Sequence, residues 1–592
     1  MRHNQKNTML TSFITTIIVL AAMFLIIWFI ILPRINIGGL PLFGNREIVP
    51  FHRYFSLNTE VTHVIMDDQL LRNAPTPLVE SRLGVYHVYL PATFLQDIVD
   101  PFMFWDASAN ALFVSTRQEM LEIMPGRLSF YRNDIPLPLS TPIRFEDGEA
   151  FLPVDLIEGL YPIEIEYRPE YSLVVISSDL AERTTGAVSS NNTPVRYRAE
   201  SRAPIAAELD QGEEVIVFLE GESSDFVRVR TLSGLIGYIS TDDIENIRTS
   251  DQLSGRPTLL ATWVDNTTPH PPMWDGRPIN HVWDVATNQD ANANRMLTPF
   301  HHSVNAVSPT WFDFDRENLR LTTNVSRAYV EWAHGQGVDV WPKVFDVNNA
   351  SARAILMDRE ARRTAISQLV HAVDTYNFDG INIDIEHLLN AEEGPYKIQF
   401  LRELAIPMRE RGIVLSAAVK VPAPWNMFYR RDLIALTVDF VMVMAYDQHH
   451  RLSEASGPVA SLAWVQQAVI NMLEEVPREQ LLLGLPFFNR AWRYAVLEDG
   501  PPDSRAWSMD YTRAFFEARD VEWEWDPEVA SYFGEVPAVE DGEAVLWRVW
   551  LECPRSISAK MQIYAVHDLA GVAGWRRFNE TEEVWDVIGR HF

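Results

Sequence analysis

The chain has 592 residues, 47% of them hydrophobic, and a formal net charge of −30 at pH 7. This length exceeds what one hydrophobic core supports, so we expect roughly two to four domains. The acidic balance argues against nucleic acid as a partner and against electrostatic capture by anionic membranes or wall polymers, because phosphate binding needs clustered Lys and Arg. The single cysteine, Cys553, excludes an internal disulfide framework.

The first predicted element is a transmembrane anchor at residues 9–32, preceded by a short cytoplasmic tail at residues 1–8. Its 24 consecutive uncharged, mostly apolar residues are long enough to span a bilayer and exceed the usual apolar core of a signal peptide. Arg2 and Lys6 lie on its amino side and favour a cytoplasmic N-terminus. We expect a single-pass membrane protein whose remaining chain is extracytoplasmic. A cleaved signal peptide is the alternative.

A small, mainly β domain is predicted at residues 46–180. Short strands such as residues 85–91 alternate with turns, and a weak internal echo relates the Leu-Pro segments at 89–91 and 151–153. The pattern resembles the copper amine oxidase N-terminal-like domain of bacterial surface proteins. That resemblance implies a spacer or binding role and no copper chemistry.

A second small β domain is predicted at residues 188–247. The preceding segment, residues 184–193, is rich in Thr, Ser, Asn and Gly and indicates a linker. Short β-runs separated by Gly turns then fit a small barrel. The Gly-Tyr-Ile-Ser ending at 237–240 resembles that of bacterial SH3-like domains, which implies binding of cell-wall peptide or a spacer role.

From residue 257 to 592 strands alternate with helices. A helix is expected to begin at Asp358, with an apolar stripe formed by Ala361, Ala365, Leu369 and Val373. Another helix is expected over 396–411, ended by Gly412. Eight strands over this range predict an α/β fold, a (β/α)₈ TIM barrel, whose chemistry lies at the C-terminal ends of its strands. The predicted strands are residues 259–264, 304–312, 338–346, 378–386, 413–422, 440–447, 481–489 and 571–577.

The most informative segment is residues 378–387, Phe-Asp-Gly-Ile-Asn-Ile-Asp-Ile-Glu-His. Polar residues alternate strictly with isoleucines, and successive side chains of a strand lie on opposite faces. Asn382, Asp384 and Glu386 would therefore share one face inside the fold. Burying acids so closely is costly unless a site uses them. A solvated face of an edge strand is the alternative.

This segment resembles the Asp-x-x-Asp-x-Asp-x-Glu signature of glycoside hydrolase family 18, the chitinase-like hydrolases. Three further motifs of that family follow in the same order: Met-Ala-Tyr-Asp at 444–447, the strand at 484–492, and Trp575. The resemblance covers residues 257–592. Segments such as residues 333–342 resemble the bacterial branch that includes spore-cortex N-acetylglucosaminidases.

The resemblance implies a role for each matched residue. Glu386 would be the general acid, and Asp384 would orient the 2-acetamido group of the substrate, whose oxygen attacks the anomeric carbon. A neighbouring carboxylate raises the pKa of an acid by like-charge repulsion, as this role needs. Tyr446 would hydrogen-bond the acetamido group, Asp447 would hold it or a sugar hydroxyl, and Trp575 would form the floor under the sugar.

The chain departs from the family pattern at Asn382, where chitinases usually carry an aspartate. The change could alter the pH profile but leaves the acid and the orienting carboxylate in place, and Asn382 stays a candidate substrate-binding residue. Asp379 is expected to stabilise the strand from deeper in the barrel. Gln448 follows the Met-Ala-Tyr-Asp motif, where wall-lytic relatives tend to carry an acid, with an effect that stays open.

Other aromatic and histidine residues are weaker candidates. Aromatic rings can stack on the apolar faces of sugars. His449 and His450 are adjacent, but no carboxylate at ligand spacing supports a metal site, and neither metal nor cofactor is implied. The tryptophans that could bind sugar or pack in the core are Trp263, Trp311, Trp425 and Trp492.

Together these features predict a membrane-anchored glycosidase that cuts β-1,4 bonds after N-acetylglucosamine with retention of configuration. Peptidoglycan is the favoured polymer because of the anchor and the SH3-like domain. A chitinase or chitooligosaccharide hydrolase is the first alternative, and a non-catalytic glycan-binding barrel is the second. A third alternative is an anchored scaffold whose barrel only positions the outer domains. Oligomeric state does not follow from the sequence.

Overall fold

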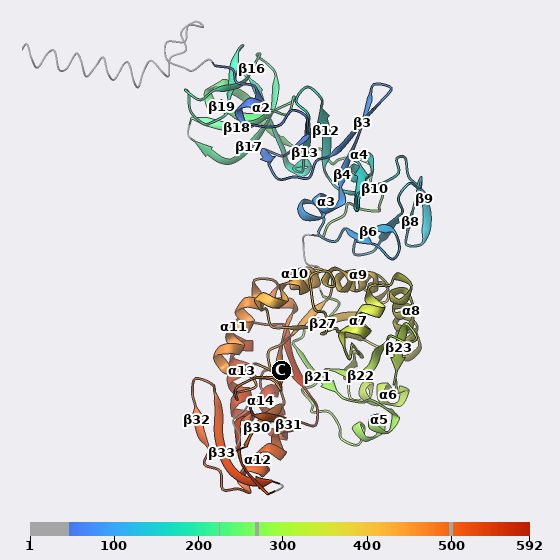
Figure 1. Ribbon diagram of the computed structural model, residues 1–592, viewed down its shortest axis with the longest axis vertical. Coiled ribbons are helices and arrows are strands. Elements are labelled where there is room, and N and C mark those ends of the chain that lie inside the picture. Colours follow the sequence, from blue (N-terminus) through green and yellow to red (C-terminus); the bar gives the residue numbers. More distant parts are fainter. Residues whose placement is uncertain (1–46, 224, 267–271, 496–500, 541) are drawn as a thin grey trace, which may run out of the picture. The chain divides into compact units, whose positions relative to one another are not determined.

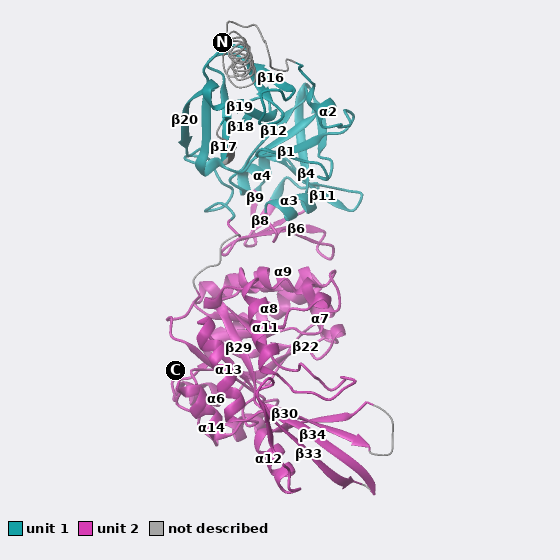
Figure 2. Ribbon diagram, turned by 90° about the vertical axis from the view of Figure 1, so that its left-hand side faces the viewer, with its two compact units in different colours: residues 1–99, 125–129, 138–264 teal, residues 100–124, 130–137, 265–592 magenta. Residues whose placement is uncertain are grey.

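The computed structural model (Figure 1) describes residues 47–223, 225–266, 272–495, 501–540 and 542–592, without the side chains of 220–223. The chain divides into two compact units (Figure 2). Residues 1–99, 125–129 and 138–264 form one unit, and residues 100–124, 130–137 and 265–592 form the other. The predicted anchor at 9–32 lies outside the described residues. Within the described part of the chain, no helix has the length and apolarity needed to cross a bilayer.

Unit 2 contains the predicted (β/α)₈ barrel. Its eight strands are all parallel, and β21 pairs with β22 to close the ring. The order around the barrel is β21, β35, β29, β28, β27, β26, β25, β22. The strands are β21 (Ile279–Asp284), β22 (Ala306–Asp315), β25 (Lys343–Phe345), β26 (Gly380–Asp384), β27 (Val414–Lys420), β28 (Phe440–Met444), β29 (Leu481–Pro486) and β35 (Gly571–Trp575).

Helices surround the strands as predicted. In α8 the Asp358 carboxylate accepts the Ala361 N–H at 2.8 Å and caps the N-terminus, and Gly412 follows α9 with φ +70°, which suits a helix end. The stripe Ala361, Ala365, Leu369 and Val373 is buried. The outer helices are α6 (Arg327–His334), α7 (Asn349–Leu356), α8 (Arg359–Tyr376), α9 (Gly394–Glu410), α10 (Arg431–Ala435), α11 (Leu462–Leu473), α13 (Pro554–His567) and α14 (Glu582–Gly589).

The prediction of a barrel strand at residues 259–264 was wrong. Residues 259–264 belong to unit 1, where the Leu259 N–H donates to the carbonyl of Gly159 at 2.8 Å and the segment follows α4 (Val154–Leu160). The first barrel strand is β21, whose six residues are all buried although half of them are polar. His281, for example, shares a 2.7 Å hydrogen bond with Ser308. Because half of its buried residues are polar, the strand does not show the run of apolar residues by which a buried strand is recognised in a sequence.

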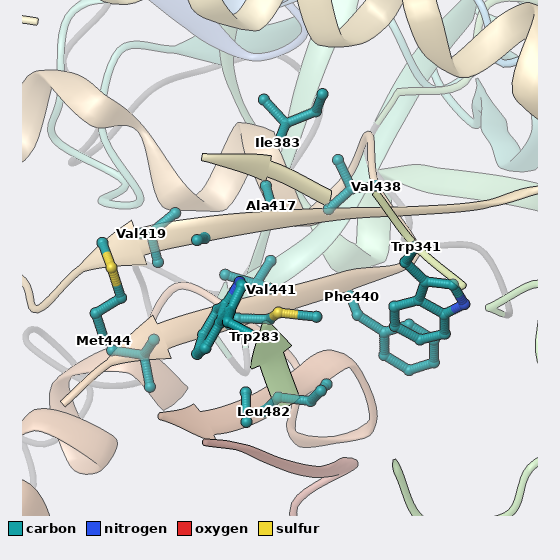
Figure 3. Packing of buried hydrophobic residues seen from close by; sticks show 14 of the residues in the cluster. Trp283, Trp341, Ile383, Ala417, Val419, Val438, Phe440, Val441, Met444 and Leu482 are labelled. Atoms are coloured by element: carbon teal, nitrogen blue, oxygen red, sulfur yellow. The ribbon is translucent and has the colours of Figure 1, made fainter. Parts of the chain in front are cut away.

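The barrel core is densely packed (Figure 3). The rings of Trp341 and Phe440 stack with centroids 6.1 Å apart. Gly380, which opens β26, lies against Trp341, and a Cβ added there would approach that ring to 2.5 Å. The glycine of the 378–387 segment is therefore required for packing under the site.

A five-stranded antiparallel sheet is inserted between β29 and α13, and the sequence analysis did not predict it. Its order is β31, β30, β34, β33, β32, and Phe516 of α12 packs on it together with Trp547. Its elements are β30 (Phe488–Ala495), β31 (Asp503–Ser508), α12 (Met509–Glu517), β32 (Glu524–Asp526), β33 (Ser531–Glu540) and β34 (Glu543–Leu551).

A small sheet from the predicted 46–180 range also belongs to unit 2. The Arg362 guanidinium of α8 is fully buried, pairs with Asp106 of this sheet, and lies 3.2 Å from the Glu403 carboxylate of α9. The sheet is therefore attached to the barrel helices by a buried ionic cluster. Its strands are β5 (Phe104–Asp106), β6 (Ala111–Ser115), β7 (Met120–Ile123), β8 (Ser129–Arg132) and β9 (Ile135–Pro138).

Unit 1 contains two four-stranded sheets. The strand–helix pairs β4–α3 and β11–α4 carry the echo seen in the sequence, and Leu90 pairs with Leu152 between them. The elements are β1 (His63–Met66), β2 (Gln69–Leu71), β3 (Leu78–Arg82), β4 (Val85–Pro91), α3 (Ala92–Ile98), β10 (Arg144–Glu146), β11 (Glu149–Pro153), β12 (Glu164–Arg168) and β13 (Leu173–Ser177).

A seven-stranded antiparallel sheet completes unit 1. The predicted linker at 184–193 was wrong, because β14 lies there and pairs with both β17 and β20. Its strands are β14 (Arg183–Val188), β15 (Thr193–Arg196), β16 (Ile205–Leu209), β17 (Glu214–Ser223), β18 (Phe226–Thr231), β19 (Ile236–Ser240) and β20 (Ile244–Ser250).

Removing the buried arginine should destabilise unit 2. We expect Arg362→Met to cost about 3–5 kcal/mol, because Asp106 and Glu403 would remain buried without their cation. The adjacent Arg363 is the matched control, since its pair with Asp134 is exposed and Arg363→Met should cost less than about 1 kcal/mol. Urea unfolding followed by tryptophan fluorescence measures both, and equal losses would contradict the prediction.

Candidate active site

The site is built on β26, whose two faces differ as predicted. Ile381, Ile383 and Ile385 are buried on one face. On the other face the Asn382 side chain contacts Trp283 of β21, Ser416 of β27 and Met442 of β28. Contacts with strands around the ring place this face inside the barrel. The alternative of a solvated edge strand is excluded, because β26 pairs on both sides and all five of its residues are buried.

Asn382 has no free group to offer a substrate. Its carbonyl oxygen accepts the Trp283 indole N–H at 2.9 Å, and its amide donates to the Ser416 hydroxyl at 3.0 Å. The side chain is fully buried. The structure therefore corrects the expectation of substrate binding at Asn382, which fills the barrel interior beneath the site.

Asp384 is a buried carboxylate with one oxygen still available. Its Oδ2 forms an ion pair with the Lys343 ammonium of β25. Its Oδ1 is buried and has no hydrogen-bond partner among the described residues. A buried acceptor without a partner is costly, so this oxygen is suited to receive a donor from a ligand.

Glu386 follows the end of β26 and keeps 34% of its side chain exposed. Burial of its carboxyl, reinforced by the charge of Asp384, raises the pKa of Glu386 from 4.5 to about 7. The ammonium of Lys420 lies 3.8 Å from its Oε2 and opposes this rise. Glu386 can therefore donate a proton near neutral pH while remaining accessible.

The backbone of Glu386 is held by a residue that the sequence analysis missed. Asp346, directly after β25, is buried and accepts the N–H of Glu386 at 2.9 Å and that of His387 at 3.0 Å. The Tyr429 hydroxyl donates to the Glu386 carbonyl at 2.6 Å. The only signal in the sequence is an acid at the end of the preceding strand, where barrel chemistry is expected.

Tyr446 and Trp575 belong to the same site. Burial, followed by the charges of Asp384 and Glu386, raises the pKa of Tyr446 well above 10, so its hydroxyl stays a neutral donor near both carboxyls. The Lys343 ammonium, which binds Asp384, lies 4.4 Å from the centre of the Trp575 ring. Asp384, Glu386, Tyr446 and Trp575 are thus brought together from β26, β28 and β35.

Asp447 lies beside this group. Its backbone has φ +58°, and its carboxylate lies 3.1 Å from the Arg490 guanidinium of β30. The side chain is 44% exposed. Asp447 therefore remains a candidate for binding a sugar hydroxyl or the acetamido group.

The candidate tryptophans separate by burial. Trp311 and Trp492 are at most 1% exposed, and their indole N–H groups donate to Asn292 and to the Gly457 carbonyl. These contacts correct the expectation that they bind sugar, because both rings are core. Trp425 is 66% exposed and stays a candidate, and Trp263 lies in unit 1.

The remaining candidates have structural contacts. The Asp379 carboxylate accepts the Val340 N–H at 2.8 Å at the start of the strands, as expected. Gln448 accepts the Ser461 N–H at 2.8 Å and supports its loop, while His449 contacts the Pro458 carbonyl. Across the described ranges, no three His, Cys, Asp or Glu side chains are grouped to hold a metal ion.

Comparisons with known proteins agree with this geometry. Residues 348–580 match the profile of "Glycosyl hydrolases family 18". The chain is 22% identical over 319 residues to "Uncharacterized glycosylase YvbX" of Bacillus subtilis, covering 51% of this chain and 89% of that protein. It is 24% identical over 249 residues to the "Cortical fragment-lytic enzyme" of the same organism, covering 40% of this chain and 56% of that enzyme.

Solved structures include a chitinase from Chromobacterium violaceum, which is 20% identical with a TM-score of 0.46, covering 53% of this chain and all of that one. The profile match contains Asp384, Glu386, Tyr446 and Trp575. Residues 348–580 are therefore similar to glycoside hydrolase family 18, and the chain is a glycoside hydrolase.

Proposed function

We propose that this protein is a membrane-anchored, extracytoplasmic glycosidase that hydrolyses β-1,4 bonds after N-acetylglucosamine in peptidoglycan. The observation that carries the proposal is the pair of adjacent acids, in which Glu386 has a pKa of about 7 and Asp384 is ion-paired. An acid that keeps its proton near neutral pH, beside a carboxyl paired with a cation, is the arrangement that glycoside cleavage needs.

The geometry fits a substrate-assisted, retaining reaction. Glu386 gives its proton to the glycosidic oxygen as the bond to the anomeric carbon breaks, and the acetamido oxygen forms a new bond to that carbon. The free Oδ1 of Asp384 accepts the acetamido N–H and stabilises the positive charge of the oxazolinium ion. Glu386, now a carboxylate, takes a proton from the water that opens this ion, and the original configuration returns.

The substrate must carry an N-acetyl group next to the scissile bond, because that group supplies the nucleophile. Peptidoglycan is favoured over chitin by the similarity to the "Cortical fragment-lytic enzyme" of Bacillus subtilis and by the predicted anchor at residues 9–32. The proposed SH3-like domain, residues 188–247, and the copper amine oxidase N-terminal-like domain, residues 46–180, would bind the wall or space the barrel from the membrane.

Digestion of purified peptidoglycan and of chitin oligomers by residues 35–592 tests the activity. We expect new reducing ends of N-acetylglucosamine from peptidoglycan, identified by mass spectrometry. Glu386→Gln should lower kcat by about 10²–10⁴-fold, because it removes the general acid and preserves shape. Trp311→Phe is a control whose activity should be nearly unchanged, since Trp311 is core.

Each unexpected product has a definite meaning. Muramic acid at the reducing ends would overturn the bond assignment, and cleavage of chitin alone would move the substrate to chitin. Full activity in Glu386→Gln would remove the proposed mechanism. Binding of glycans without cleavage by the wild type would leave a glycan-binding barrel.

The pH profile tests the protonation of Glu386. Because the acid must carry its proton and its pKa is about 7, kcat/KM should fall above pH ~7 by about tenfold per unit. Initial rates on an aryl chitobioside between pH ~4 and ~9, at fixed ionic strength, measure this fall in kcat/KM, which is the alkaline limb of the pH profile. A decline that is already complete below pH ~5 would mean that Glu386 has the pKa of an ordinary carboxyl.

A further inference from the structure

The distribution of lysine in this chain is uneven. The sequence contains 50 Lys and Arg residues, of which five are lysines: Lys6, Lys343, Lys397, Lys420 and Lys560. Lys6 lies outside the described residues, and Lys560 is buried in a pair with Glu552. The other three surround the active site, although arginine supplies nearly all other cationic contacts of the chain.

Each of these three lysines contacts one residue of the tripeptide Asp384–Glu386. The Lys343 ammonium pairs with the Asp384 carboxylate. The Lys397 ammonium of α9 donates to the Ile385 carbonyl at 3.1 Å. The Lys420 ammonium, at the end of β27, donates to the Glu386 carbonyl at 2.9 Å and lies 3.8 Å from Glu386 Oε2. Three cations from three elements therefore converge on three consecutive residues.

We propose that Lys343, Lys397 and Lys420 form a lysine cage that positions the catalytic tripeptide, with Lys343 fixing the Asp384 carboxyl and Lys420 fixing Glu386. The inference rests on the proposed function, because it assigns these lysines to the same cleavage reaction. The cage residues act through the two acids and are positioning residues.

The charge balance of the site supports the cage. Asp346, Asp384 and Glu386 are three acids grouped at the strand ends, and a lone buried charge is costly. Burial lowers the pKa of Lys397 to about 8, so this lysine is still a cation at neutral pH. Lys343 and Lys420 both act to lower the pKa of Glu386. Tyr429 interacts electrostatically with Glu386, and Tyr446 with both Asp384 and Glu386. Other charged or titratable groups interact with the cage or with neighbouring residues: the neutral His281 with Lys343, Arg431 with Lys397, His387 with Asp346, and Asp447 with Tyr446.

Lys343 has a further geometric role. Its ammonium lies between the Asp384 carboxylate and the face of Trp575, 4.4 Å from the ring centre. A cation over an aromatic ring is attracted by the ring quadrupole. Lys343 thus links Asp384, the orienting acid, to Trp575, the expected floor of the sugar site. Asn382 cannot take this role, because it is uncharged and its side-chain amide already forms hydrogen bonds with Trp283 and Ser416.

The test compares pH profiles of kcat/KM on an aryl chitobioside for Lys343→Met, Lys343→Arg and Lys420→Met. Lys343 lowers the pKa of Glu386, so without this cation the upper limb of the Lys343→Met profile, where Glu386 loses its proton, should move to higher pH by about one unit. Lys343→Arg keeps the charge and should restore the wild-type limbs. Lys420→Met should move the upper limb in the same direction, because Lys420 also lowers the pKa of Glu386 and lies 3.8 Å from its Oε2.

Lys560→Met is the matched control, since it removes an equally buried lysine from a different ion pair. It should leave both limbs unmoved, whatever its effect on thermal stability. The side chain of Lys420 is one-third exposed, so its variant keeps the test open if Lys343→Met fails to fold.

The cage would be overturned if the pH profiles of Lys343→Met and Lys420→Met kept the wild-type limbs while kcat/KM fell equally at every pH. These lysines would then have only a packing role. An inactive wild type would instead overturn the proposed function, and the cage with it. Failure of the cage in an active wild type leaves the proposed function intact.

Discussion

The site depends on the electrostatic coupling of two carboxyls, Asp384 and Glu386, at the end of one barrel strand. Asp384 is buried, whereas Glu386 keeps one-third of its side chain exposed. Burial of its carboxyl and the charge of Asp384 raise the pKa of Glu386. The Lys343 ammonium pairs with Asp384 and compensates a negative charge there. A second negative charge, on Glu386, is less favourable, and Glu386 therefore keeps its proton to higher pH. The difference between the two acids is the source of the chemistry.

The barrel makes this coupling possible. Parallel strands end at the same rim, so β25, β26, β27 and β28 bring Lys343, Asp384, Lys420 and Tyr446 together although they are distant in sequence. Inside the ring Asn382 bonds to Trp283 and Ser416, which fills the space below the acids. The rim then leaves Glu386 partly exposed above a rigid base.

Local patterns predicted much of this. The two-residue period of β26 indicated which face carries the acids, and Asp358 with its apolar stripe indicated α8. Contacts between distant elements could not be predicted: the packing of Trp311 and Trp492, the support of Glu386 by Asp346, and the convergence of three lysines. The polar strand β21 lacked a hydrophobic signal, because half of its buried residues are polar. The sheet inserted after β29 was not predicted, although β34 alternates buried with partly buried residues.

The central claim is that Glu386, beside the Asp384 carboxyl that pairs with Lys343, has a pKa of about 7 and so keeps its proton far above the range of an ordinary carboxyl. Infrared difference spectra between the wild type and Glu386→Gln, recorded across a pH titration, observe that proton directly. The account predicts a protonated-carboxyl band that disappears with a midpoint near pH 7. A midpoint near the ordinary value of 4.5 would contradict it, because Glu386 would then have no proton to donate.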